Sequence, residues 1–88
     1  MLGVFKQGEA LTSSHDLNNK PIGCYTINPS TLGTPSNAPE SKHAIFLGFG
    51  GGISSAWGIQ MYFPTDQSYF YFRTHVSSTF YSWNKVEV

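Results

Sequence analysis

The chain is predicted to be mainly β: a small antiparallel meander sheet with long loops and at most one short helical turn. The strongest indication is the segment 69–76, where polar-headed side chains alternate with Phe, Thr and Val. Only the two-residue period of a β-strand separates two such sets onto opposite faces. No stretch has a convincing helical period, and clusters of Gly, Pro, Ser and Asn divide the remainder into short segments typical of strands and turns.

The N-terminal half is expected to contain one strand. We expect residues 1–11 to be a leader or the end of an upstream segment, and residues 12–88 to be the domain. Residues 12–19 offer N-capping side chains for one short helical turn, and residues 20–23 form a Pro-Gly turn before a strand at 24–28. Residues 29–40 are predicted to be a loop, because their three prolines lack the N–H donor that a central strand needs.

The C-terminal half is expected to supply the rest of the sheet. Strands are predicted at 43–49, 57–63, 69–76 and 80–88. A flexible Gly/Ser connection is expected after Phe49, and turns at 64–67 and 77–79. The 64–67 turn has hairpin length, so the strands on either side of it should be antiparallel.

The size of the chain points to self-association. With 88 residues, it buries only roughly 60–65% of the surface that its unfolded form exposes. Cys24 is the sole cysteine, so no disulfide can form within one chain. His15, His43 and His75 lack the spacing of zinc ligands, and no metal or other cofactor is expected. Oligomerisation remains as the stabiliser.

Charge and hydropathy exclude two classes of partner. Five basic and five acidic residues cancel and are not clustered, whereas nucleic-acid binding needs a basic stripe. No apolar run approaches the ~20 residues needed to span a bilayer, so no membrane insertion is expected. The low charged fraction of 11%, with 16% aromatic residues, is common in extracellular β-structures.

No arrangement of residues predicts an enzyme. The glycines at 48–52 are not followed by the Lys-Ser/Thr of a phosphate loop or by a helix. The Ser, His and Asp residues are scattered, and no acidic pair has a spacing suited to glycoside hydrolysis. Cys24 is expected to be a small buried core residue. No catalytic residue is assigned.

Aromatic side chains divide into two groups. The first is predicted to be core: Trp57, Phe63, Phe70, Phe72, Phe80 and Trp83. The second combines planar rings with hydrogen-bonding groups and is predicted to form a solvated sheet face, a subunit interface or a sugar-binding surface: Gln60, Tyr62, Tyr69, Tyr71, Arg73 and His75. The candidate ligand or receptor residues are Gln60, Tyr62, Tyr71, Arg73, His75 and Trp83.

The order of several short motifs resembles the pyocin-knob type domain of phage and R-type pyocin tail fibres. These motifs are Asp16-Leu17-Asn18, Gly23-Cys24-Tyr25, Asn37-Ala38-Pro39, a strand centred on Gln60, Tyr71-Phe72-Arg73-Thr74, and Ser82-Trp83-Asn84-Lys85. The resemblance covers about residues 12–88. It departs from the family at Phe80-Tyr81, which precede the final motif in place of a commoner second Trp, and at Cys24, where a larger residue is usual.

The resemblance implies a role in attachment rather than a reaction. A knob-like domain of this kind belongs to a virion tail fibre, as a homotrimer, and helps the particle to attach to a bacterial surface glycan or other receptor. Such a protein is made in the bacterial host cytoplasm and is extracellular after release. The resemblance also implies structural roles for Asp16, Asn18, Gly23, Tyr25, Asn37 and Pro39. In particular, Gly23 would align Tyr25, the Gln60 amide would bind neighbouring backbone, and Arg73 would stack on Trp83.

Two other functions fit the same residues. One is a carbohydrate-binding accessory module of an enzyme that degrades cell-surface polymers. The other is a small hydrolase, which would require a deep polar pocket holding a His and an acid.

Overall fold

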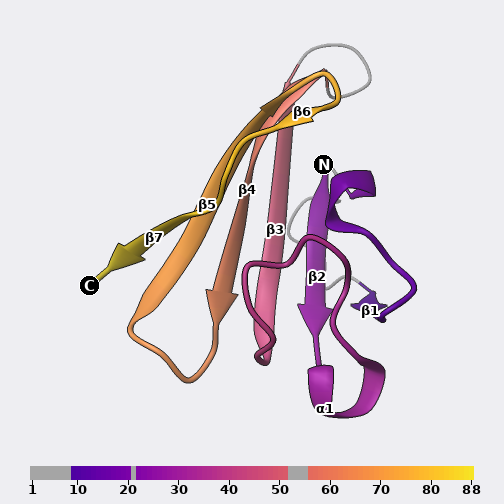
Figure 1. Ribbon diagram of the computed structural model, residues 1–88, viewed down its shortest axis with the longest axis vertical. Coiled ribbons are helices and arrows are strands. Elements are labelled where there is room, and N and C mark those ends of the chain that lie inside the picture. The colour runs from indigo at the N-terminus through magenta and orange to yellow at the C-terminus, as the bar shows by residue number, and fades with distance from the viewer. Residues whose placement is uncertain (1–8, 21, 52–55) are drawn as a thin grey trace.

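The computed structural model describes residues 9–20, 22–51 and 56–88, and within these ranges one seven-stranded sheet forms the frame of the protein (Figure 1). In chain order the elements are β1 (Ala10–Leu11), a 3-10 turn (Leu17–Asn19), β2 (Gly23–Ile27), α1 (Pro29–Leu32), β3 (Ala44–Gly51), β4 (Trp57–Pro64), β5 (Tyr69–Val76), β6 (Thr79–Phe80) and β7 (Asn84–Glu87).

The sheet is an antiparallel meander from β2 to β6, which confirms the predicted fold class. Two details differ from the prediction. The short β1 pairs in parallel with β2. The strand predicted at 80–88 is divided, because β6 pairs with the end of β5 while β7 pairs with its beginning.

The register of the three long strands defines two faces of the sheet. Phe46, Tyr62 and Tyr71 lie opposite one another on what we call the inner face. The outer face carries the alternate positions, which are mostly apolar and without a charged residue: Cys24, Thr26, Ile45, Leu47, Phe49, Gly51, Trp57, Ile59, Met61, Phe63, Phe70, Phe72, Thr74, Val76, Asn84 and Val86.

The hydrophobic core lies against the inner face. Its buried members are Leu11, Leu17, Ile27, Ala44, Phe46 and Tyr62. Leu17 comes from the 3-10 turn, and Ala38, from the long loop after α1, also packs against the core, so these two connections cover the inner face. Leu11 is fully buried, so the end of the segment predicted to be a leader contributes a side chain to the core.

The predicted assignment of core and surface was wrong for the long strands. Trp57 is 54% exposed, and Phe63, Phe70 and Phe72 remain only partly buried on the outer face. Cys24, expected in the core, is also only partly buried there. Both faces carry aromatic rings, so the rings alone do not indicate which face is covered. The loops cover the inner face because its polar side chains can form hydrogen bonds with them.

Smaller differences concern the turns. Pro29 occupies the start of α1, where its missing N–H costs nothing, so the segment predicted to be a loop contains a second helical turn. Gly50 and Gly51 continue β3 instead of forming a flexible connection. The predictions for the leader at 1–8, for Pro21 and for the connection at 52–55 lie outside the described residues.

Candidate functional site

Four of the six candidate ligand residues lie in the interior. Gln60 and Tyr62 are fully buried, and His75 and Arg73 expose only 2% and 4% of their surface. Tyr71 and Trp83 are partly exposed. In this protomer, a ligand at the surface can therefore contact Tyr71 and Trp83, whereas the other four are buried below the surface.

Three polar side chains from distant parts of the chain form one buried network. The Arg73 Nε donates to Gln60 Oε1 at 2.8 Å, and its Nη2 donates to Asn18 Oδ1 at 2.7 Å. The Gln60 amide nitrogen donates to the Leu17 carbonyl at 2.8 Å. The network ties β4 and β5 to the 3-10 turn, and the amide–backbone contact expected of Gln60 is present.

The guanidinium of Arg73 also lies close to two rings. Its central carbon is 4.6 Å from the ring centroid of Trp83 and 4.6 Å from that of Phe80. Burial lowers the pKa of Arg73 to about 10, against the opposing effect of Asp16. The group stays cationic at neutral pH, and the two nearby rings compensate for part of the lost water.

The motif residues beside this network have structural roles. Asp16 Oδ1 accepts hydrogen bonds from the Asn18 N–H at 2.9 Å and the Asn37 amide at 2.7 Å. Asn37 has a φ of 68°, and its carbonyl accepts from Trp83 Nε1 at 2.8 Å. This loop therefore holds the Trp83 ring edge-on to Tyr62.

Gly23 and Tyr25 form a separate local arrangement at the start of β2. Gly23 has a φ of 135°, which only glycine adopts readily, and a Cβ there would lie 2.7 Å from the Tyr25 hydroxyl. The Tyr25 hydroxyl donates to the Ile22 carbonyl at 2.8 Å. Gly23 thus permits the packing of Tyr25. Pro39 is partly buried in the loop that covers the inner face.

His75 ends the inner row of β5. Its ring stacks on Phe80 with centroids 4.6 Å apart, and both ring nitrogens are buried. Burial, with a smaller effect from Arg73, lowers the pKa of His75, so the ring is neutral at neutral pH.

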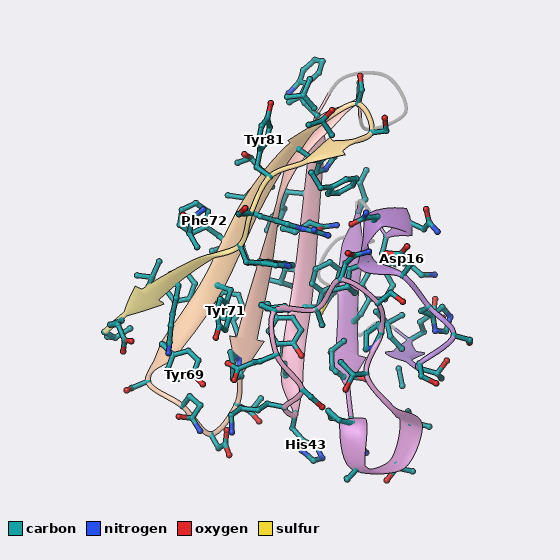
Figure 2. The ribbon with its side chains drawn as sticks, viewed as in Figure 1. Asp16, His43, Tyr69, Tyr71, Phe72 and Tyr81 are labelled. Atoms are coloured by element: carbon teal, nitrogen blue, oxygen red, sulfur yellow. The ribbon has the colours of Figure 1, made fainter. Side chains whose placement is uncertain are left out.

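The partly exposed end of the inner face holds a group that we call the Tyr–Glu cluster: Glu40, Tyr69, Tyr71 and Lys85. Figure 2 shows Tyr69 and Tyr71 along the first half of β5. The Tyr69 hydroxyl donates to Glu40 Oε1 at 3.1 Å, while Glu40 Oε2 is buried. The Lys85 ammonium lies 4.0 Å from the Tyr69 ring centroid.

The aromatic rings around this cluster form a connected series. Tyr69 and Tyr71 meet edge to face at 5.7 Å, Tyr71 and Tyr62 at 6.4 Å, and Tyr62 and Trp83 at 6.1 Å. The buried Tyr62 hydroxyl donates to the Glu40 carbonyl at 2.9 Å. It therefore fixes the backbone that carries the carboxylate, so the exposed groups rest on a rigid base.

The hydroxyls of the cluster remain protonated at neutral pH. Desolvation, with the nearby Glu40 carboxylate, raises the pKa of Tyr69 to about 12 and raises the pKa of Tyr71. Desolvation also raises the pKa of Tyr62 to about 12. The site thus offers hydroxyl donors, a carboxylate acceptor, an ammonium and ring edges, which suits a ligand rich in hydroxyl groups.

Sequence reasoning missed Glu40 and Lys85. Glu40 lies in a proline-rich loop whose path the sequence does not predict. Lys85 pairs with Tyr71 across β5 and β7, and only the register of that final strand could have indicated it.

Two further features are absent from the part of the chain that the structure describes. No three His, Cys, Asp or Glu residues there are grouped as metal ligands would be, and no helix there has the length and apolar character to cross a membrane. No protein-family model, curated protein or solved structure matches the chain.

Proposed function

We propose that this chain is a knob domain of a phage, prophage or pyocin tail fibre, which contributes to host-cell attachment at a bacterial surface polysaccharide and to fibre structure. It is not an enzyme. Its partners are further copies of itself, as a homotrimer, and a surface glycan or receptor. It acts in the virion tail fibre, extracellular after release, and is synthesised in the bacterial host cytoplasm.

The observation that carries the attachment role is the Tyr–Glu cluster. Sugars are recognised by planar rings together with a few fixed polar groups. Here Tyr69 and Tyr71 supply hydroxyls, the Glu40 carboxylate accepts from the Tyr69 hydroxyl, and Lys85 stands beside them with 43% of its side chain exposed.

The resemblance to tail-fibre knobs is supported by how its motifs converge. Asn18, Gln60, Arg73 and Trp83 come from four separate motifs and meet around one guanidinium. This convergence accounts for the motif residues as a structural frame. Ligand recognition then falls to the neighbouring, partly exposed residues, so domains with the same structural frame can carry different ligand sites.

Several weak sites on one fibre would act together. One site of this size, with a few hydrogen bonds worth about 0.5–1.5 kcal/mol each, gives weak binding by itself. Linked copies raise the effective local concentration, so a fibre binds a repetitive polysaccharide by orders of magnitude more tightly than one protomer. Attachment therefore requires no deep pocket.

The test is binding of the protein to a panel of purified bacterial surface polysaccharides. Replacing Tyr71 by Phe removes one hydroxyl and keeps the ring, so we expect affinity for the glycan that binds best to fall by about threefold to tenfold. The matched control is Tyr81→Phe, since Tyr81 is 53% exposed outside the cluster; it should bind like wild type. Equal affinity in the two variants, or no binding across the panel, would contradict the proposal.

A carbohydrate-binding accessory module would use the same cluster. The glycan assay does not separate it from a fibre knob, whereas the domain encoded beside this one does: a polymer-degrading enzyme there would favour the accessory module.

A further inference from the structure

The outer face is the largest apolar surface that the sheet presents. None of its side chains is buried, although the inner positions of the same strands, among them Phe46, Gln60 and Tyr62, are. It also lacks any charged residue, in a chain that has ten. Monomeric proteins rarely expose a contiguous apolar patch larger than a few hundred Å² without using it.

The size of the face suits a specific protein interface. The five strands that form it hold 33 residues, from 5, 8, 8, 8 and 4 in β2, β3, β4, β5 and β7. At about 3.3 Å per residue and about 4.8 Å between strands, they span a plane of about 500 Å² before side-chain relief is counted. That exceeds the roughly 400 Å² per partner of incidental contacts and approaches the roughly 600 Å² at which specific interfaces begin.

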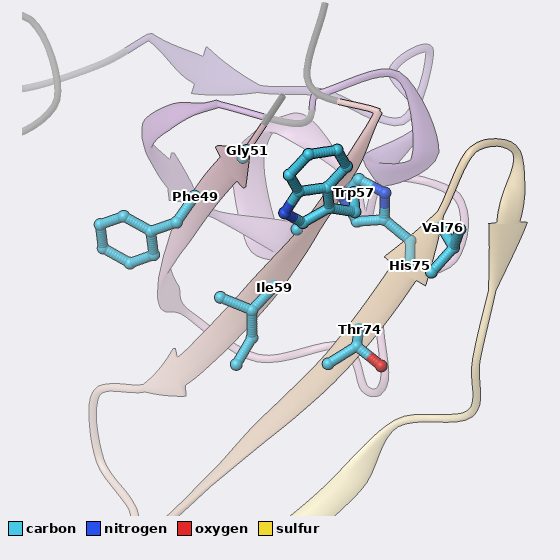
Figure 3. A pocket seen from close by; sticks show the side chains of 9 residues that line it. Phe49, Gly51, Trp57, Ile59, Thr74, His75 and Val76 are labelled. Carbon is cyan, nitrogen blue, oxygen red and sulfur yellow. The ribbon is translucent and has the colours of Figure 1, made fainter. Parts of the chain in front are cut away.

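One end of the face is hollowed. A hollow of about 530 Å³ is lined by residues from the ends of β3, β4 and β5, including Phe49, Trp57 and Ile59 (Figure 3). Trp57 and Val76 at this end are 54% and 55% exposed. An apolar surface that faces this end of the sheet can pack against the protruding indole and fill the hollow beside it.

We propose that the outer face is covered by a further copy of this chain, so that copies meet through the uncharged faces of their sheets. A partner of different sequence is normally selected by complementary charges, and this face offers none. Copies of one chain related by a symmetry axis can each turn the same face toward that axis, and a face without charge does so without like-charge repulsion. Sheets whose apolar faces pack stand about 10 Å apart, so each copy would bury its layer of rings against its neighbours.

This inference rests on the self-association in the proposed function and deepens it by assigning the surface. It is independent of the glycan site. The Tyr–Glu cluster lies on the inner side of β5 and β7, so assembly through the outer face leaves it accessible to a ligand. The physical layout is a sandwich in which each protomer covers its inner face with its own loops and its outer face with a neighbour.

The experiment measures molar mass in solution by light scattering for the full chain and two Ile→Lys variants. Ile45→Lys places a charge on the outer face near the start of β3, between Thr26 of β2 and Phe63 of β4. Ile22→Lys is the matched control, because Ile22 is 47% exposed and lies before β2, off the sheet. We expect an oligomeric wild type, an oligomeric Ile22→Lys and a monomeric Ile45→Lys with an unchanged β-sheet circular dichroism spectrum.

The outcomes separate the two proposals. A wild-type trimer that becomes monomeric in Ile45→Lys supports both the homotrimer and the outer face as its interface. A wild-type dimer that becomes monomeric in Ile45→Lys supports the outer face and contradicts the homotrimer. An oligomer that Ile45→Lys leaves intact overturns the assigned face alone. A monomeric wild type overturns both kinds of self-association but not glycan binding.

A measurement without mutation guards against an unfolded variant. Cys24 is the sole thiol and lies partly buried on the outer face. Its alkylation by iodoacetamide in the wild-type chain should slow as protein concentration rises, because assembly covers it. A rate that does not change with concentration would overturn the proposal.

Discussion

At the scale of single residues, Arg73 is the centre of the buried network. It joins Gln60, Asn18, Trp83 and Phe80, and its contact with Asn18 spans 55 positions of the sequence. Burying a cation is costly unless every donor finds a partner. Two of its N–H groups donate to carboxamide oxygens, and its central carbon lies 4.6 Å from each of two ring centroids.

Replacing Arg73 by Met should lower the free energy of unfolding by about 2–5 kcal/mol, because Gln60 and Asn18 then keep acceptors that nothing satisfies. Lys85→Met is the control, since it also removes a cation above a ring, but an exposed one; it should cost about 1 kcal/mol or less. Urea unfolding measures both. A loss below about 1 kcal/mol in Arg73→Met would mean that desolvation offsets the whole network.

His75 gives the fold a dependence on pH. Its pKa in the folded protein lies below its ordinary value, mainly through desolvation. The unfolded chain therefore takes up the proton first, and below about pH 6.5 it binds more protons than the native state. The contribution of the neutral His75 ring to the free energy of unfolding is thus fully present above about pH 6.5 and is lost as the pH falls below that value.

We expect the wild type to lose free energy of unfolding more steeply than His75→Gln between pH 7.5 and pH 5, since glutamine does not titrate. His43→Gln, the same substitution at an exposed histidine, is the matched control. Denaturant unfolding at a series of pH values provides the comparison. Identical slopes in His75→Gln and wild type would show that His75 does not contribute.

At the scale of elements, the sequence was sufficient for the strands and not for their faces. The alternation at 69–76 predicts β5 with its observed bounds, and the proline and glycine positions predict the turns around it. Alternation defines two sets of side chains but does not say which set is covered. That choice depends on the loops, because Leu17, Lys20 and Glu40 supply the carbonyls that Gln60 and Tyr62 need.

The candidate site shows the same limit. Tyr71 and Trp83 were predicted from residue type and do lie near the surface, whereas the polar heads of Gln60, Arg73 and His75 suggested exposure and are buried instead. Residue type predicts burial poorly when a polar group has a fixed partner, since a satisfied amide or guanidinium is tolerated in the interior. The partners lie up to 55 positions away in the sequence, beyond the reach of any local pattern.

At the scale of the whole molecule, the amount of surface is ordinary and its distribution is not. The chain exposes 5104 Å², about what a compact monomer of 9.7 kDa exposes. The loops that cover the inner face account for the core, and no element among the described residues forms a second layer over the outer face. A β-sheet is stable when both of its apolar faces are covered by other elements. In the free protomer the outer face is apolar and lacks such a cover from the described residues.

Thermal stability should consequently depend on protein concentration. If folding and assembly through the outer face are coupled, a tenfold rise in concentration adds about 1.4 kcal/mol to each association step, which corresponds to a rise of about 3–6 °C in the unfolding midpoint for an assembly of this size. Calorimetry of the wild type across such a range measures it. Ile45→Lys, without the interface, should melt at a lower temperature that does not vary with concentration, and Ile22→Lys should follow the wild type. A wild-type midpoint that stays constant across the range would mean that the protomer is stable by itself and that its apolar face is left to solvent.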